Sequence, residues 1–565
     1  MTLKREWWKT DLIYQIYPRS FRDSNGDGIG DLNGILESLD YLEWLGVRAV
    51  WLSPIYPSPM ADFGYDVSEY KDVDPVFGRL DDLQRLLDEM HRRGIKLVLD
   101  FIPNHTSSEH AWFRASEARE AGFEDFYVWL DGKEDEQGKP QPPNNWEAHF
   151  GGSMWSWSEA RGQFYLHHFL PQQPDLNYRC PPVRQAMRDV LSFWLEFGVD
   201  GFRADAVDCL VEDEDFTDKK EDGESPYEGR PGTFDVIKEW TELCAEFGRE
   251  KGKDIFFTTE AYCKPDGARR YFRAGVSFPF NFGLIEWGRA NNCSTFLRRR
   301  IDEQMVSVLG ECESWWPNWV LSNHDNARVA SRLSSSGELS RVAMTLLLML
   351  PGTPTHYYGD ELGLTNVQIA ETERVDCDGR DGCRTPMAWH CRAPAAGFSS
   401  AKPWLPLHAD WRTRNVETQM ADPDSNLAYF RRLLKLKQES AILRQNDGRN
   451  FIMLESGLEE VFMFLRLSQS LLNPFALLVI LNLYEQDIRL PSFELSLGIG
   501  ASIDIGRLLL DSRRPSSDSL EVVQFQKLRM KAGQALVLQL GPLPFLPNPH
   551  PWLCRLAKVT ACPIS

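Results

Sequence analysis

The sequence predicts an α/β protein: a (β/α)8 TIM barrel with a small lobe inserted after the third strand and a C-terminal antiparallel β-domain. Three observations favour this fold class. Apolar, strand-like runs alternate with stretches of helical spacing, the pattern of a parallel sheet with helical crossovers. The runs before Asp205, Glu260 and Asp325 each lead into an acidic residue, where a barrel presents reactive groups. After about Gly448, short strands replace the alternation.

The barrel elements can be placed in order along the chain. Apolar, strand-like runs lie at 12–17, 48–52, 95–100, 199–205, 255–260, 319–322 and 353–358. Helical spacing of apolar residues lies between some of them, at 35–45, 80–91 and 183–197. Consecutive parallel strands need a crossover of roughly a dozen residues, usually a helix, and these stretches supply it.

The domain boundaries follow from the places where this pattern breaks. From about Thr106 to Gln172 the chain is rich in Gly, Pro, Trp and Asn, which indicates a small lobe over the barrel mouth. Short strands at 461–465, 476–483 and 535–540 indicate a separate β-sandwich domain, and the Pro-rich stretch from Gly541 indicates an irregular tail. We therefore expect the barrel in residues 1–104 and 173–448, the lobe in 105–172, and the C-terminal domain with its tail in 449–565.

Composition excludes several kinds of partner. A formal net charge of −20 would repel polyphosphate backbones, so we expect no nucleic acid. The 11 cysteines include no CxxC pair, which argues against a zinc site, and their odd number argues against a disulfide framework. Because neither a secretory signal nor a long apolar run is visible, we expect no membrane partner and a cytoplasmic monomer or homodimer. A secreted form whose leader had been removed would have the same sequence.

Four short segments carry the clearest motifs: 100–105 (DFIPNH), 201–205 (GFRAD), 260–262 (EAY) and 323–325 (NHD). In this order and at strand ends, they resemble the four sequence regions of the α-amylase family, glycoside hydrolase family 13. Further segments at 7–21, 173–177 (QPDLN) and 384–387 (RTPM) resemble the α-glucosidase and oligo-1,6-glucosidase branch, and the match extends from about Trp7 to Leu443.

The residues themselves suggest how two of these acids would act. Arg203 and Asp205 are two apart on a strand and so face the same side, where the guanidinium would keep Asp205 ionised as a nucleophile. Glu260 follows an apolar run, and apolar walls with an anionic Asp205 nearby would keep it protonated as the general acid and later base. The structural alternatives are a buried Arg–Asp pair for Arg203 and Asp205, and a helix cap or a solvated group for Glu260.

The resemblance implies sugar contacts for Arg203 and for a further set of residues. Asp325 would be the third acid, which holds sugar hydroxyls. Asp62 and Arg384 would close the pocket around one terminal glucose, and Tyr65 and Phe169 would be its aromatic walls, with core packing as their alternative role. The complete set of predicted sugar-binding residues is Asp62, Tyr65, His105, Phe169, Arg203, His324 and Arg384.

These implied roles describe an exo-acting, retaining α-glucosidase that releases α-glucose from short α-glucosides by double displacement. A sugar hydroxyl in place of water would give transglucosylation. Ala206 follows the nucleophile where 1,6-preferring relatives tend to carry Val, which favours α-1,4 bonds and maltose- or sucrose-like substrates. The alternatives are a sucrose isomerase or glucosyl transferase of the same family, and a non-enzymatic protein like the heavy chains of amino-acid transporters.

The segment 23–31 (DSNGDGIGD) places oxygen donors at every second residue around glycines that permit a tight loop. It is not an EF-hand, because the twelfth position is Gly34 rather than Glu. The branch has a similar site in its first βα loop. We therefore expect a structural Ca²⁺ or Mg²⁺, against the alternative of a metal-free turn. Its ligands would be Asp23, Asn25, Asp27, the Ile29 carbonyl and Asp31.

Overall fold

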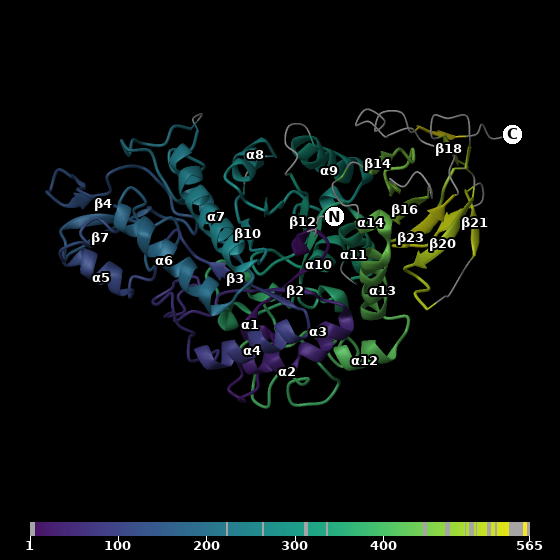
Figure 1. Cartoon of the computed structure of the whole chain (residues 1–565), viewed down its shortest axis with the longest axis horizontal. Helices are drawn as coiled ribbons and strands as arrows, with labels where there is room; N and C mark the ends of the chain where they lie inside the picture. The colour runs from purple at the N-terminus through teal and green to yellow at the C-terminus, as the bar shows by residue number, and fades with distance from the viewer. Residues whose placement is uncertain are drawn as a thin grey trace.

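The fold is described from a computed structural model of the chain (Figure 1). The described residues are 6–221, 224–262, 265–309, 315–334, 337–444, 448, 450–468, 475–491, 493–496, 502–503, 505–516, 521–525, 528–541 and 558–561.

A parallel sheet of eight strands forms the centre of the molecule, in the order β11-β10-β9-β3-β2-β1-β13-β12. The strands are β1 (Ile13–Ile16), β2 (Ala49–Leu52), β3 (Lys96–Phe101), β9 (Gly201–Ala204), β10 (Phe256–Thr259), β11 (Phe278–Pro279), β12 (Asn318–Val320) and β13 (Thr353–Tyr357). Between the two end strands, the Asn281 amide donates to Asn318 Oδ1 at 3.2 Å, which brings the open edges together. The predicted barrel is confirmed.

Helices cover the outside of the sheet, and their apolar faces bury its outer surface. They are α2 (Leu32–Glu37), α3 (Leu39–Leu45), α4 (Leu80–Arg92), α6 (Pro181–Phe197), α7 (Pro231–Lys251), α8 (Pro265–Arg273), α9 (Ser294–Leu309), α10 (Val329–Leu333), α11 (Ser340–Met349) and α13 (Asn426–Glu439). The residues of β1, β2 and β9 are all buried, as expected for strands covered on both faces. Each catalytic candidate then follows the carboxyl end of a strand.

Two local predictions differ from the structure. The helix expected at 35–45 is two helices, α2 and α3, separated at Ser38, whose hydroxyl donates to the Gly34 carbonyl at 2.8 Å. The strand β11 was not predicted, because two residues that include a proline leave no alternating pattern to recognise.

The segment between β3 and α6 forms a small lobe with its own core, at the left of Figure 1. It contains α5 (Ala111–Glu117), an antiparallel sheet of β4 (Trp129–Leu130), β8 (Gln163–Leu166) and β7 (Trp155–Ser158), and a hairpin of β5 (Lys133–Glu134) and β6 (Pro140–Gln141). The Trp146 indole donates to the Thr217 carbonyl at 2.9 Å and so ties the lobe to the loop after β9. The predicted limits of 105–172 for this lobe stay a prediction.

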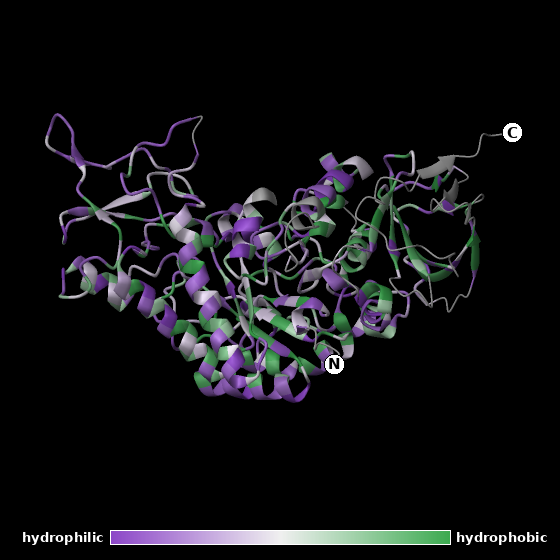
Figure 2. Ribbon diagram, turned by 45° about the horizontal axis from the view of Figure 1, so that its top comes forward, coloured by the Kyte–Doolittle hydropathy of each residue, from purple (hydrophilic) through white to green (hydrophobic). Residues whose placement is uncertain are grey.

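The C-terminal domain is built on an antiparallel sheet in the order β14-β15-β16-β23-β20-β21. Its strands are β14 (Phe451–Leu454), β15 (Val461–Leu467), β16 (Ala476–Asn482), β23 (Ala535–Leu540), β20 (Ile505–Asp511) and β21 (Val522–Gln524). Along β15, Phe462 and Phe464 pack into the barrel core, whereas Val461, Met463 and Leu465 face the domain's own core. Figure 2 accordingly shows these strands largely green, and the lobe mostly purple or white.

The predicted irregular tail is only partly described. Within it, β24 (Lys558–Ala561) pairs antiparallel with β18 (Phe493–Ser496), so this part is a strand and not irregular. Residues 542–557 and 562–565 lie outside the described residues. No helix in the described ranges is long and apolar enough to cross a bilayer.

Candidate active site

A cavity of about 510 Å³ opens at the carboxyl ends of the barrel strands. Every predicted catalytic and sugar-binding residue lines it except Arg203 and Arg384, which lie behind its wall. Its lining residues are Asp62, Tyr65, His105, His149, Phe150, Phe169, Gln173, Asp205, Ala206, Asp208, Cys209, Glu228, Glu260, Tyr262, His324, Asp325, Asn326, Asp378 and Arg380. The strand order thus brings together residues that are far apart in sequence.

The Arg203 side chain is the link between the acids at the base of this cavity. Its Nη1 lies 2.7 Å from Asp100 Oδ1 and 2.5 Å from Asp205 Oδ1, and its Nη2 lies 2.7 Å from Glu260 Oε2. The register explains this convergence, since β9 lies between β3 and β10 and Arg203 is level with Asp100. With Arg203 only 1% exposed, its charge acts in a dry environment.

Burial separates the protonation states of the two central acids. It raises the pKa of Asp205 to about 6, and the Arg203 guanidinium opposes a larger rise. Burial raises the pKa of Glu260 further, to about 8, because the Asp205 and Asp325 carboxylates add to it while Arg203 opposes. Near pH 7, therefore, Asp205 is ionised and Glu260 carries the proton.

Asp325 has the opposite electrostatic environment. Its Oδ1 lies 3.1 Å from a guanidinium nitrogen of Arg380 and 3.1 Å from one of Arg384, and its Oδ2 lies 3.2 Å from His324 Nε2. Burial alone would raise the pKa of Asp325, but the guanidinium groups of Arg384 and Arg380 outweigh that effect and lower it. Asp325 is therefore an anion throughout the range in which Glu260 titrates.

The arginine that reaches the cavity is not the one that the sequence indicated. Arg380 lines the wall and donates to Asp62 Oδ1 at 2.7 Å, while Gln173 Nε2 donates to Asp62 Oδ2 at 3.2 Å. Arg384 is 1% exposed, donates from Nε to the His324 carbonyl at 2.7 Å, and orients Asp325 from behind. Of these two arginines, only Arg380, four residues earlier in the same loop, lines the cavity, and the sugar clamp at Arg384 stays a prediction.

A chain of hydrogen bonds fixes the aromatic wall beside Asp325. Gln15 Nε2 donates to His324 Nδ1 at 2.8 Å, which leaves His324 Nε2–H to face Tyr65 Oη at 2.5 Å. The Tyr65 hydroxyl in turn donates to Asp100 Oδ2 at 3.2 Å. Burial lowers the pKa of His324 to about 3, so its ring is neutral. Tyr65 is 5% exposed, and only a small part of the ring faces the cavity.

A second aromatic group lies across the cavity on the lobe. The Phe169 ring centroid is 5.1 Å from that of His105 and 6.1 Å from that of Phe150. Burial lowers the pKa of His105 to about 4, so this imidazole is also neutral. His105 and Phe169 were predicted, whereas Phe150 and His149 were not, because the lobe sequence gives no motif for them.

The mouth of the cavity contains further residues that the sequence did not indicate. Tyr262 is 61% exposed, and its ring stacks on that of Phe282 at 4.5 Å. Its hydroxyl accepts from Asn326 Nδ2 at 3.4 Å. Tyr262 stands two residues after Glu260, so its place in the EAY motif was the one available signal. Asp208, Glu228 and Asp378 complete the mouth.

The loop predicted to bind a cation satisfies its carboxylates internally. Asp23 accepts from the backbone amides of Asn25, Gly26 and Gly28, and Asp31 accepts from Ser24 and from the Gly34 amide at the start of α2. Among the described residues, the carboxylates of Asp23, Asp27 and Asp31 are not gathered into one cluster of three metal-binding groups. The cation stays a prediction.

Two carboxyl groups that contact one guanidinium at the carboxyl ends of neighbouring barrel strands form the arrangement that a glycoside hydrolase uses. The family model described as "Alpha amylase, catalytic domain" matches residues 15–446. The chain belongs to the α-amylase family, and within it to the α-glucosidase branch.

Similar proteins agree with this assignment. Maltase A2 of Drosophila melanogaster is 40% identical over 484 residues, which is 82% of this chain and 84% of that protein. The amino acid transporter heavy chain SLC3A1 of Homo sapiens is 37% identical over 78% of this chain and 65% of its own length. The crystal structure of the trehalulose synthase MutB from Pseudomonas mesoacidophila MX-45 has a TM-score of 0.84 and 29% identity, covering 95% of this chain and 100% of that one.

The opposite protonation states predict a bell-shaped pH dependence of kcat/KM for p-nitrophenyl α-glucoside. Activity should rise as Asp205 ionises near pH 6 and fall as Glu260 loses its proton near pH 8. The two limbs belong to the coupled pair rather than to either residue alone. In the Glu260→Gln variant, the residual kcat/KM should no longer fall near pH 8, because the group that loses its proton there is gone. An alkaline limb that persists in this variant would contradict the assignment of Glu260.

Proposed function

We propose that the protein is an exo-acting, retaining α-glucosidase that releases α-glucose from the non-reducing end of short α-glucosides. The observation that carries this proposal is the pair of an ionised Asp205 and a protonated Glu260, both held by the Arg203 guanidinium at the base of the cavity. Maltase A2 and other α-glucosidases among the relatives support the substrate class.

The pair suits a double displacement. Asp205 attacks the anomeric carbon while Glu260 passes its proton to the leaving oxygen, which gives a β-glucosyl-enzyme. Glu260, now a carboxylate, takes a proton from water, and the hydroxide releases α-glucose from Asp205. Inverting enzymes keep their carboxyl groups about 6.5–9.5 Å apart to hold a water between them. Asp205 and Glu260 contact two nitrogens of the same Arg203 guanidinium, at 2.5 and 2.7 Å, and this closeness supports retention.

The charged groups at the base support exo action. The Arg380–Asp62 ion pair, at 2.7 Å, closes one side of the cavity beside Asp325. The paired guanidinium and carboxylate can donate to and accept from the hydroxyls of one terminal glucose. Tyr65 and Phe169 present ring edges and faces against which the apolar face of the sugar packs.

Two of the similar proteins suggest alternative functions for this chain. The structural likeness to a trehalulose synthase is compatible with an isomerase or glucosyl transferase, in which the glucosyl-enzyme reacts with a sugar hydroxyl instead of water. The likeness to a transporter heavy chain is compatible with a non-enzymatic protein. The ordered triad of Asp205, Glu260 and Asp325 around one cavity favours catalysis over the second of these.

Hydrolysis can be tested with maltose, isomaltose, sucrose, maltotetraose and p-nitrophenyl α-glucoside. The wild type should release α-glucose, seen by NMR before mutarotation, and Asp205→Asn should lower kcat/KM by at least about 10³-fold because the nucleophile is lost. Arg392→Ala, at an exposed ion pair, serves as the control. Failure of the wild type to cleave any of these compounds, or full activity of Asp205→Asn, would overturn the proposal. Rearranged disaccharide from sucrose would identify an isomerase.

The linkage preference for α-1,4 bonds depends on Ala206, which lines the cavity next to the nucleophile. Its φ of 46° is in the left-handed region, where a β-branched residue is strained, so Ala206→Val will also lower stability. The ratio of kcat/KM for isomaltose to that for maltose is therefore the useful quantity, and Ala206→Val should raise it several-fold relative to wild type. An unchanged ratio in the folded variant would remove Ala206 from the linkage argument.

We further propose that the loop 23–31 binds a structural Ca²⁺ or Mg²⁺ through Asp23, Asn25, Asp27, the Ile29 carbonyl and Asp31. A bound ion would replace the internal hydrogen bonds of the loop and stabilise the folded state by mass action. Millimolar Ca²⁺ should then raise Tm in chelator-treated protein, and Asp27→Ala should abolish that rise. Equal Tm values with and without either ion would show that the loop is a metal-free turn.

A further inference from the structure

The cavity has two parts that differ in how their carboxylates are paired. At the base, the carboxylates of Asp62, Asp205 and Asp325 each contact a guanidinium group, which belongs to Arg203, Arg380 or Arg384. At the mouth, the charged lining residues that the structure describes are acidic: Asp208, Glu228 and Asp378. Over the described part of the chain, none of these three carboxylates has an ion-pair partner within 4.0 Å.

The three mouth acids come from two loops: Asp208 and Glu228 lie between β9 and α7, and Asp378 lies after β13. Asp208 lies on a short 3-10 helix, Val207–Cys209, directly after the nucleophile. The amide of Gly229 donates to the Asp208 carbonyl at 2.7 Å, which places the neighbouring Glu228 beside that helix. Asp378 lies on the loop of Arg380, where its own amide donates to Asp376 Oδ2 at 3.1 Å. Burial and the nearby Glu228 raise the pKa of Asp208 to about 6, so it is still ionised at neutral pH.

The exposed aromatic ring of Tyr262 lies at the same mouth as these acidic residues. Tyr262 is held by stacking on Phe282 and leaves 61% of its surface open at the mouth. The face of an aromatic ring attracts cations, and flanking carboxylates strengthen that attraction. A cleft lined by charges of one sign also concentrates ligands of the opposite sign by about 10–10³-fold and repels those of the same sign.

We propose that the mouth selects α-glucosides by the charge of the aglycone, the group beyond the terminal glucose. Neutral and cationic aglycones are accepted, and aglycones that carry phosphate, sulfate or carboxylate are rejected. Asp208, Glu228 and Asp378 determine this specificity, and Tyr262 supplies the contact surface. The inference rests on the proposed α-glucosidase activity and names the substrate class for that same site.

Three aryl α-glucosides of similar shape test the proposal. Their phenyl rings carry, at the para position, a trimethylammoniomethyl group, a neutral neopentyl group, or a sulfomethyl group. The methylene spacer keeps the charge away from the leaving oxygen, and ratios between protein variants cancel the remaining difference in reactivity. In wild type at low salt, kcat/KM for the cationic compound should exceed that for the anionic one by at least about 10-fold, and salt should shrink this ratio.

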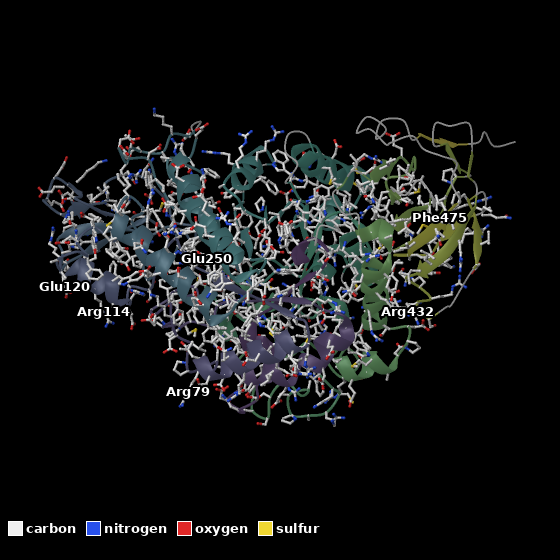
Figure 3. All side chains as sticks on the ribbon, viewed as in Figure 1. Arg79, Arg114, Glu120, Glu250, Arg432 and Phe475 are labelled. Carbon is white, nitrogen blue, oxygen red and sulfur yellow. The ribbon has the colours of Figure 1, made fainter. Side chains whose placement is uncertain are left out.

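The decisive variant carries three amide substitutions, Asp208→Asn, Glu228→Gln and Asp378→Asn. In this variant the ratio of kcat/KM for the cationic compound to kcat/KM for the anionic one should fall close to the ratio of their intrinsic reactivities. The matched control is Glu120→Gln, Glu136→Gln and Glu250→Gln, which makes the same change in net charge at exposed positions outside the cavity. Figure 3 labels Glu120 at the outer edge of the lobe and Glu250 on α7. If the triple variant does not fold, the single variant Glu228→Gln, at an exposed residue, can be measured instead. Its ratio of kcat/KM for the cationic to the anionic compound should lie below that of the wild type.

Two results would overturn the inference. The first is that the wild type shows no preference between the two charged compounds. The second is that the control variant loses as much of the preference as the triple amide variant does, which would assign the effect to the overall charge of −20. Hydrolysis of the neutral compound separates these from a failure of the proposed function. If wild type does not cleave the neutral compound either, the α-glucosidase proposal fails rather than the charge selection.

Discussion

The site depends on one buried guanidinium. Arg203 contacts Asp100, Asp205 and Glu260 at 2.5–2.7 Å, and it is the group that permits three carboxyls to be buried close together. Without a cation among them, burial would drive protons onto these acids and remove the nucleophile. With it, the shared positive charge keeps the pKa of Asp205 near 6, while Glu260, beside two other acids, rises to about 8. One residue on β9 thus sets two different chemical roles.

Farther from Arg203, other arginines pair with the carboxylates of the cavity wall. Arg384 orients Asp325 from behind, and Arg380 joins Asp325 to Asp62 along the wall. Neutral imidazoles at His105 and His324 can then donate or accept hydrogen bonds without disturbing the charge balance. The carboxylates at the base are therefore paired with guanidinium groups, whereas those of Asp208, Glu228 and Asp378 at the mouth have no ion-pair partner among the described residues. This difference separates recognition of the terminal glucose from selection of the group beyond it.

Much of this could be predicted from the sequence, for identifiable physical reasons. Buried parallel strands have nearly continuous apolar sequences, so seven of the eight barrel strands could be located in the sequence. The eighth, Phe278–Pro279, is too short to give a recognisable pattern. The acids at strand ends were found because the strand period fixes which side chains face the cavity. Arg380 was missed in favour of Arg384, because which of the two reaches the cavity depends on the 3-10 turn Arg380–Cys383 between them. The stacking of Tyr262 on Phe282 and the meeting of the mouth acids depend on loop paths that no local motif specifies.

The central claim is that Asp205 forms the covalent bond to glucose while Glu260 transfers the proton. Incubation of the wild type with 5-fluoro-α-D-glucosyl fluoride, followed by proteolysis and mass spectrometry of the peptides, tests this directly. The fluorine slows breakdown of the glucosyl-enzyme more than its formation, so the intermediate should accumulate. The account predicts one fluoroglucosyl group per chain, attached to Asp205. A label on Glu260 or Asp325, or turnover without any covalent adduct, would contradict it.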